Sequence, residues 1–114
     1  MSDCIFCKII NREIPSKIVF ENDKVIAFYD ISPQAPVHVI IVPKQHIASH
    51  NDLNEQNVDV MKDIHLAANI IAKQEGIAES GYRIINNCGQ DAGQTVLHMH
   101  YHLVGGKPMG MDIL

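Results

Sequence analysis

The chain has 114 residues, a formal net charge of −4 at pH 7, and 46% hydrophobic residues. This length suits a single domain, residues 1–114, with one hydrophobic core. The charge and the lack of any basic stripe argue against a nucleic-acid partner. No leader-like segment and no stretch of ~18 apolar residues is found, so we expect a cytoplasmic protein with no membrane partner.

Three cysteines give an odd count, and two of them form the pair Cys4-Ile-Phe-Cys7. In a reduced compartment this spacing indicates a metal or redox pair rather than a disulfide framework. Cys88 stands apart and is predicted to be an ordinary thiol.

The first half of the chain predicts one short helix and three strands. Residues 4–15 carry apolar side chains at helical spacing and predict a short amphipathic helix. Residues 17–23 and 24–31 are rich in β-branched and aromatic residues and meet at an Asn-Asp turn, which predicts a hairpin. The apolar run over residues 37–44 predicts a third strand that is buried on both faces.

The second half predicts a long helix and two more strands. Asn54 is a suitable N-cap for a helix that ends at Gly76. Residues 81–88 predict a fourth strand, residues 89–94 a glycine-bearing loop, and residues 96–104 a fifth strand. This order predicts an α+β fold, with a five-stranded antiparallel sheet, one long helix and a short N-terminal helix.

Within the predicted last strand, "LHMHYHLV" places His98, His100 and His102 at alternate positions. In a strand these side chains share one face, with neighbours roughly 6.6 to 6.8 Å apart. Two adjacent histidines could therefore share one ion, but all three could not without a bulge. A solvated polar face explains one or two histidines better than it explains three in register, so we expect a site in which the histidines have separate tasks.

Phosphorus chemistry suits such a division, because a neutral imidazole attacks phosphorus well and also leaves it easily. The preceding stretch "GQDAGQT" offers backbone N–H groups and the Thr95 hydroxyl for phosphate oxygens or a leaving group. The Gly105-Gly106 pair that follows the histidines indicates either a plain turn or a close approach of ligand.

Two stretches, "LHMHYHLV" and "FYDISPQAPVHVIIVPKQHI", closely resemble the signatures of the histidine triad family. The resemblance covers residues 4–106 and is strongest to the Hint branch of nucleotide-binding proteins. It implies a homodimer whose two sheets join into a continuous ten-stranded sheet. It also implies hydrolysis of purine nucleoside 5′-phosphoramidates, with acyl-nucleotides as further candidate substrates, in a surface groove that binds a purine nucleoside monophosphate.

The resemblance implies a role for each matching polar residue. His100 corresponds to the nucleophile that becomes a nucleotidyl-histidine, and His102 to the donor that hydrogen-bonds the phosphate. His38 joins the network behind the nucleophile, Thr95 stands near the leaving group, and the carboxylate of Asp30 accepts from the ribose hydroxyls.

The resemblance also implies two sets of residues that line the nucleotide. The apolar pocket for the base would comprise Ile5, Phe6, Ile9, Phe28 and Ile31. The phosphate side would comprise Asn87, Gly93, Gln94 and Val96. For any single apolar member, an ordinary place in the core is the alternative.

The CxxC pair of this chain resembles that of family members that hold structural Zn²⁺ through two cysteines and two histidines. The corresponding residues are Cys4, Cys7, His46 and His98, a closed Cys₂His₂ set that catalysis does not need. The alternative is a pair of half-buried thiols beside a core histidine.

The sequence departs from the eukaryotic members in its CxxC pair, in Tyr29 for a histidine, in Thr95 for a serine, and in a tail without tryptophan. The tail leaves the preference for the amine undetermined. Three other functions stay open: hydrolysis of dinucleoside polyphosphates, a nucleotide-binding interaction module, and a zinc hydrolase in which His98 and His100 share an ion. The last would lose its activity to chelators.

Overall fold

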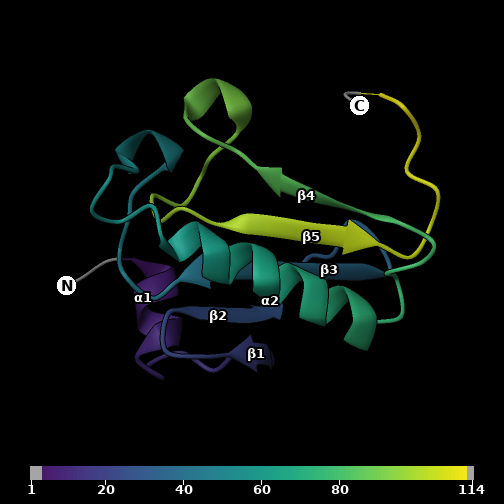
Figure 1. The fold of residues 1–114 in the computed structure, drawn as a ribbon, viewed down its shortest axis with the longest axis horizontal. Helices are drawn as coiled ribbons and strands as arrows, with labels where there is room; N and C mark the ends of the chain where they lie inside the picture. Colours follow the sequence, from purple (N-terminus) through teal and green to yellow (C-terminus); the bar gives the residue numbers. More distant parts are fainter. Residues whose placement is uncertain (1–3, 113–114) are drawn as a thin grey trace.

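The computed structural model describes residues 4–112, which form one antiparallel sheet with helices on it. The strands are β1 (Ile18–Glu21), β2 (Val25–Tyr29), β3 (Val37–Pro43), β4 (Tyr82–Asn86) and β5 (Tyr101–Gly105). They follow the order β1-β2-β3-β5-β4, and each neighbouring pair is antiparallel (Figure 1). The predicted α+β class with five antiparallel strands is confirmed.

Two α-helices accompany the sheet, α1 (Ile5–Ile10) and α2 (Val60–Gln74). Two single 3₁₀ turns, η1 (His50–Asp52) and η2 (Gln90–Ala92), lie in the connections. Figure 1 shows α2 lying across one face of the sheet, with α1 near the N-terminal end. None of the helices within residues 4–112 has the length and apolar character needed to cross a membrane.

The long helix buries one side because its apolar residues recur at helical spacing. Ile64, Ala68 and Ile71 are completely buried in the main core cluster. The cluster includes Val39 and Ile41 of β3, which alternate along the strand with residues on the other face. The face opposite α2 is therefore left for His38 and for the residues packed under α1.

The short helix α1 covers part of that opposite face. Phe6 and Ile9 are buried against Phe28, Ile40 and Val42 of β2 and β3 in a second apolar cluster. The side chain of Cys4 caps the helix by accepting a hydrogen bond from the backbone N–H of Cys7 at 3.3 Å. One short helix thus places both cysteines beside the sheet.

The long helix begins five residues later than the sequence predicted. The side chain of Asn54 accepts from the backbone N–H groups of Gln56 and Asn57, so it stabilises an irregular turn instead of capping α2. Asp59 is the N-cap, and the buried Val60 is the first helical residue.

The last strand is shorter than predicted, because it begins at Tyr101 and not at residue 96. The backbone carbonyl of His100 accepts from the side chain of Asn86, and the N–H of Met99 donates to the carbonyl of Ile47. These bonds replace strand pairing just before β5. Only His102 of the three histidines therefore belongs to a strand.

The two glycines after the histidines serve the turn and its packing. A Cβ atom at Gly105 would lie 2.9 Å from Ile77 Cδ1 and 3.1 Å from the carbonyl oxygen of Gly81. Gly106 has a φ of 94°, which L side chains rarely adopt. Packing within the protein accounts for Gly105, and the turn accounts for Gly106.

Candidate active site and metal centre

Three histidine rings form a row on the sheet face opposite α2. His38 comes from β3 and His102 from β5, where it pairs with Ile40, and His100 lies just before β5. The ring centroids of His38 and His102 are 5.1 Å apart, and those of His102 and His100 are 5.2 Å apart. The edge of Phe6 packs against His100 with a centroid distance of 5.0 Å.

The proton positions of His38 and His102 follow from one backbone donor. The N–H of Gln34 donates to His38 Nδ1 at 3.0 Å, so the proton of a neutral His38 must be on Nε2. That atom lies 2.9 Å from His102 Nδ1 and donates to it. His102 therefore carries its own proton on Nε2, where it can donate to a bound ligand.

In His100 the proton is on the other ring nitrogen, Nδ1. Its Nδ1 lies 2.8 Å from the backbone carbonyl of His98, and since a carbonyl only accepts, Nδ1 must carry the proton. The lone pair of His100 is therefore on Nε2. A lone pair on one ring and an N–H on the next suit attack on a phosphorus atom and binding of its oxygens.

Burial keeps His102 uncharged at neutral pH. Desolvation, reinforced by the nearby His100 and His38, lowers the pKa of His102 from 6.5 to about 4. The ring is half-buried and so remains open to a ligand. At pH 7 the ring is therefore neutral, and its Nε2–H can donate a hydrogen bond.

Asp30 lies directly after β2 and next to this row. Its Oδ1 accepts from the N–H of Ser32 at 2.7 Å, and its Oδ2 lies 3.5 Å from His38 Nε2. The side chain is half-buried, so its oxygens retain capacity to accept from a ligand.

The loop that carries Thr95 is held by Gln94. The amide of Gln94 donates to the carbonyls of Ala48 and Val96 at 2.8 and 3.0 Å and accepts from the N–H of Gly89 at 3.0 Å. Its side chain is therefore engaged within the protein, and a phosphate contact from this residue would come from its backbone. Thr95 itself is exposed, and Gly93 has a φ of 83° in the same loop.

The apolar residues predicted for the base divide into two groups. Phe6, Ile9 and Phe28 are buried in the cluster under α1, and Val96 packs against that cluster. By contrast, Ile31 is 97% exposed and Ile5 is 45% exposed. The first group forms a buried apolar floor under α1, whereas Ile5 and Ile31 face solvent.

A cavity of about 370 Å³ opens on the side of His102 that faces β4. Its polar lining consists of Gln34, His38, Arg83, Asn87 and His102. Its apolar lining consists of Ala35, Ile85, Val104 and Met109. Asn87 was predicted from the sequence, but Arg83 and Met109 were not. Strand alternation could have placed Arg83 on the face of His102, whereas nothing local in the tail predicts the position of Met109.

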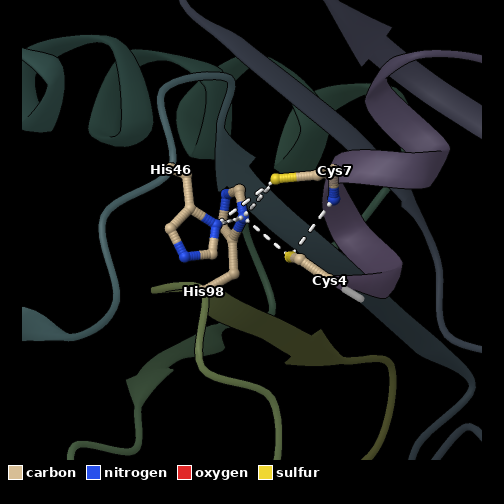
Figure 2. Close-up of side chains that lie close together, drawn as sticks. All are labelled: Cys4, Cys7, His46 and His98. Carbon is tan, nitrogen blue, oxygen red and sulfur yellow. Dashed lines mark hydrogen bonds between the residues drawn. The ribbon is translucent and has the colours of Figure 1, made fainter. Parts of the chain in front are cut away.

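The second cluster of the site joins the N-terminal segment to the sheet. Figure 2 shows the side chains of Cys4, Cys7, His46 and His98 converging. Cys4 Sγ lies 3.3 Å from His98 Nδ1, Cys7 Sγ lies 3.3 Å from His46 Nδ1, and the two Nδ1 atoms are 3.1 Å apart. All four potential ligand atoms lie within 4.8 Å of one another.

The chemistry of this cluster fits a tetrahedral metal ion. His98 is completely buried and its Nε2 donates to the carbonyl of Pro43 at 2.8 Å, so its Nδ1 lone pair faces the two thiols. Bond lengths to Zn²⁺ of about 2.1 and 2.3 Å give ligand separations of about 3.4 to 3.8 Å, close to those observed. Burial and a hydrogen bond with Cys4 raise the pKa of the Cys7 thiol, so metal binding must release its proton.

Two other metal arrangements are disfavoured by the proton positions. Asp30, His38 and His102 also lie close enough for one ion, but His38 Nε2 carries a proton in the bond to His102. His98 directs its lone pair to the thiols, while His100 directs Nδ1–H to a carbonyl, so these two do not present a shared pair of ligands. This geometry argues against the zinc-hydrolase alternative.

Comparison with known proteins agrees with this site. The family described as "Scavenger mRNA decapping enzyme C-term binding" matches residues 3–112. The chain is 50% identical over 108 residues to the purine nucleoside phosphoramidase of Escherichia coli K12, covering 95% of this chain and 91% of the relative. It is 45% identical over 109 residues to a 14 kDa zinc-binding protein of Brassica juncea, covering 94% and 96%.

A solved structure gives the same result. The HIT family hydrolase from Clostridium thermocellum superposes with a TM-score of 0.97 at 58% identity, covering 100% of this chain and 99% of the other. The chain belongs to the histidine triad family, and its resemblance to the Hint branch is confirmed.

Proposed function

We propose that this protein hydrolyses purine nucleoside 5′-phosphoramidates through a covalent nucleotidyl intermediate on His100. The observation that carries the proposal is the set of proton positions fixed by the N–H of Gln34 for His38 and His102 and by the carbonyl of His98 for His100. It provides a lone pair on His100 Nε2 beside an N–H on His102 Nε2. The 50% identity to the phosphoramidase of E. coli supports the substrate class.

The reaction would take place in two displacements. His100 Nε2 attacks phosphorus, the P–N bond to the amine breaks, and the departing nitrogen receives a proton relayed from solvent by the Thr95 hydroxyl. Water then attacks phosphorus and gives up a proton to solvent, the bond to His100 breaks, and the nucleoside monophosphate leaves. His102 stabilises the developing charge on the phosphate oxygens in both steps, with His38 holding its tautomer.

The nucleoside would lie toward α1. Asp30 accepts from the two ribose hydroxyls, since Ser32 occupies only one position on its carboxylate. The base would pack on the floor of Phe6, Ile9 and Phe28 under the rim of Ile5 and Ile31. The phosphate side would be completed by Asn87, Gly93, Gln94 and Val96.

We also propose that Cys4, Cys7, His46 and His98 hold Zn²⁺. The ion would serve a structural role, because all four positions of a tetrahedral site are occupied by protein ligands. The named zinc-binding relative of Brassica juncea supports this assignment.

A homodimer would complete the sheet. β4 is an edge strand that pairs with β5 alone within the described chain, and edge strands invite pairing. Ile84 of β4 is 38% exposed, and Leu66 of α2 is 51% exposed. We infer that β4 pairs with β4 of a second copy to give ten strands, with these side chains covered.

Hydrolysis of adenosine 5′-phosphoramidate tests the proposed function. We expect release of AMP by the wild type and a loss of at least about a thousandfold in His100→Ala, the usual size for removal of a nucleophile. His65→Ala is the matched control, because His65 is exposed on α2 and distant from the row. Equal activity in the wild type and His100→Ala would contradict the proposal.

A further inference from the structure

The side chain of Asn86 holds the main chain of the proposed nucleophile. Its Nδ2 donates to the backbone carbonyl of His100 at 2.9 Å. A carbonyl only accepts, so it is the nitrogen of the amide that faces it. Asn86 is half-buried at the end of β4, and His100 is buried. The bond therefore joins β4 to the residue that would carry the nucleotide.

This bond lies where regular strand pairing stops. Asn86 pairs with Tyr101 in the pair that ends the β4–β5 ladder (Figure 1). Residues 94–100 form neither helix nor strand. A regular strand would direct His98 and His100 to one face, but the ring of His98 lies beside the cysteines. The ladder consequently does not hold His100, and the amide of Asn86 supplies a hydrogen bond in its place.

Two hydrogen bonds together restrict the orientation of the His100 ring. The Nδ1–H of the ring donates to the carbonyl of His98 at 2.8 Å, which sets the ring relative to its own segment. The bond from Asn86 sets that segment relative to β4. The direction of the Nε2 lone pair depends on both bonds.

The strands that anchor His100 also hold His102. Ile85, the neighbour of Asn86 in β4, pairs with His102 in β5. The ring centroids of His100 and His102 are 5.2 Å apart. In the proposed reaction one ring attacks phosphorus while the other donates to its oxygens, so their spacing must be kept. Misplacing a reacting group by about 1 Å can slow a reaction about a hundredfold.

Resting on the proposed function, we propose that Asn86 is a positioning residue for the nucleophile. Its amide holds the main chain of His100 so that Nε2 points at phosphorus while His102 binds the phosphate. Asn86 lines neither the cavity beside His102 nor the apolar cluster under α1, so it acts through His100. The requirement at this position is a hydrogen-bond donor. An aspartate has nearly the same shape, but at neutral pH its carboxylate only accepts.

Two variants and a matched control test this. Asn86→Asp keeps the shape of the side chain and removes the donor, and Asn86→Ala removes the whole amide. The control is Asn69→Asp, which adds the same charge on α2. Asn69 is exposed and accepts from the hydroxyl of Tyr82, as an aspartate also can.

Two quantities are compared in each protein. The first is the rate at which adenosine 5′-phosphoramidate disappears in a single turnover with the enzyme in excess. The second is the dissociation constant of AMP, measured by calorimetry. Urea unfolding checks that each variant is folded under the conditions of the assay.

We expect the single-turnover rate to fall about tenfold to a hundredfold in both Asn86 variants, with the dissociation constant of AMP changed less than about threefold. The control should match the wild type in both quantities. A merely structural role would weaken AMP binding together with the rate. An unchanged rate in both variants, or a loss of AMP binding as large as the loss of rate, would therefore overturn the inference. Absence of turnover by the wild type would instead overturn the proposed function, so the two failures are distinguishable.

Discussion

Removing the proposed Zn²⁺ from the Cys₂His₂ cluster should release α1 from the sheet, while the sheet and α2 remain folded. A six-residue helix is too short to be stable alone, so its order depends on docking. Burying Phe6 and Ile9 contributes about 3 to 6 kcal/mol. Ordering six backbone residues costs about 6 to 12 kcal/mol. A bound ion present at about a thousand times its dissociation constant adds about 4 kcal/mol. This approximately offsets the difference between the ordering cost and the gain from apolar burial.

Hydrogen exchange measures this directly. After chelation, or in Cys7→Ser, we expect the amides of residues 5–10 to lose protection by about a hundredfold to a thousandfold, since about 1.4 kcal/mol corresponds to tenfold. The amides of α2 should keep their protection. Cys88→Ser is the control, because that thiol lies outside the cluster.

The reasoning would be refuted by unchanged protection of residues 5–10 once elemental analysis shows that zinc is gone. The apolar contacts of Phe6 and Ile9 would then suffice to dock α1. If instead zinc never copurifies and does not bind on addition, the metal assignment itself is wrong.

Three further predictions concern stability and the loop. The lowered pKa of His102 favours its neutral form in the fold, so stability is fully present above pH 6.5 and is lost as pH falls toward 4. Between pH 7 and 4.5, the free energy of unfolding measured in urea should fall about 2 to 3 kcal/mol less in His102→Gln than in the wild type. An equal fall in both proteins would contradict this. Gly105→Ala should lower the free energy of unfolding by about 1 to 3 kcal/mol, because its Cβ meets the Gly81 carbonyl; an unchanged midpoint would show that the turn yields. Gln94→Ala should reduce kcat/KM for adenosine 5′-phosphoramidate at least about tenfold, because the loop bearing Thr95 loses three hydrogen bonds; full activity would show that the loop holds its shape without them.

Periodicity was enough to predict the sheet and the long helix. The apolar spacing of Ile64, Ala68 and Ile71 indicated one buried helix face, and the runs around β2 and β3 indicated strands. Element ends were less predictable, because they depend on side chains that compete with the backbone. Asn54 bonds to a turn and Asn86 bonds to the carbonyl of His100, and neither bond has a local signal.

The sequence predicted which residues form the candidate site better than it predicted how their side chains are arranged. The alternation of histidines suggested one strand face, but His98 turns to the cysteines while His100 and His102 remain side by side. That division depends on contacts between residues 52 to 94 positions apart. Arg83 is visible in the sequence only as one more charged strand residue, since the cavity around it is closed by the tail.

The central claim is that His100 forms a covalent bond to the nucleotide. Mass spectrometry of the intact protein, taken without acid after brief mixing with adenosine 5′-phosphoramidate, tests it most directly. The account predicts an added adenylyl mass in the wild type and none in His100→Ala. An adduct that persists in His100→Ala, or AMP released by the wild type with no adduct at any mixing time, would contradict it.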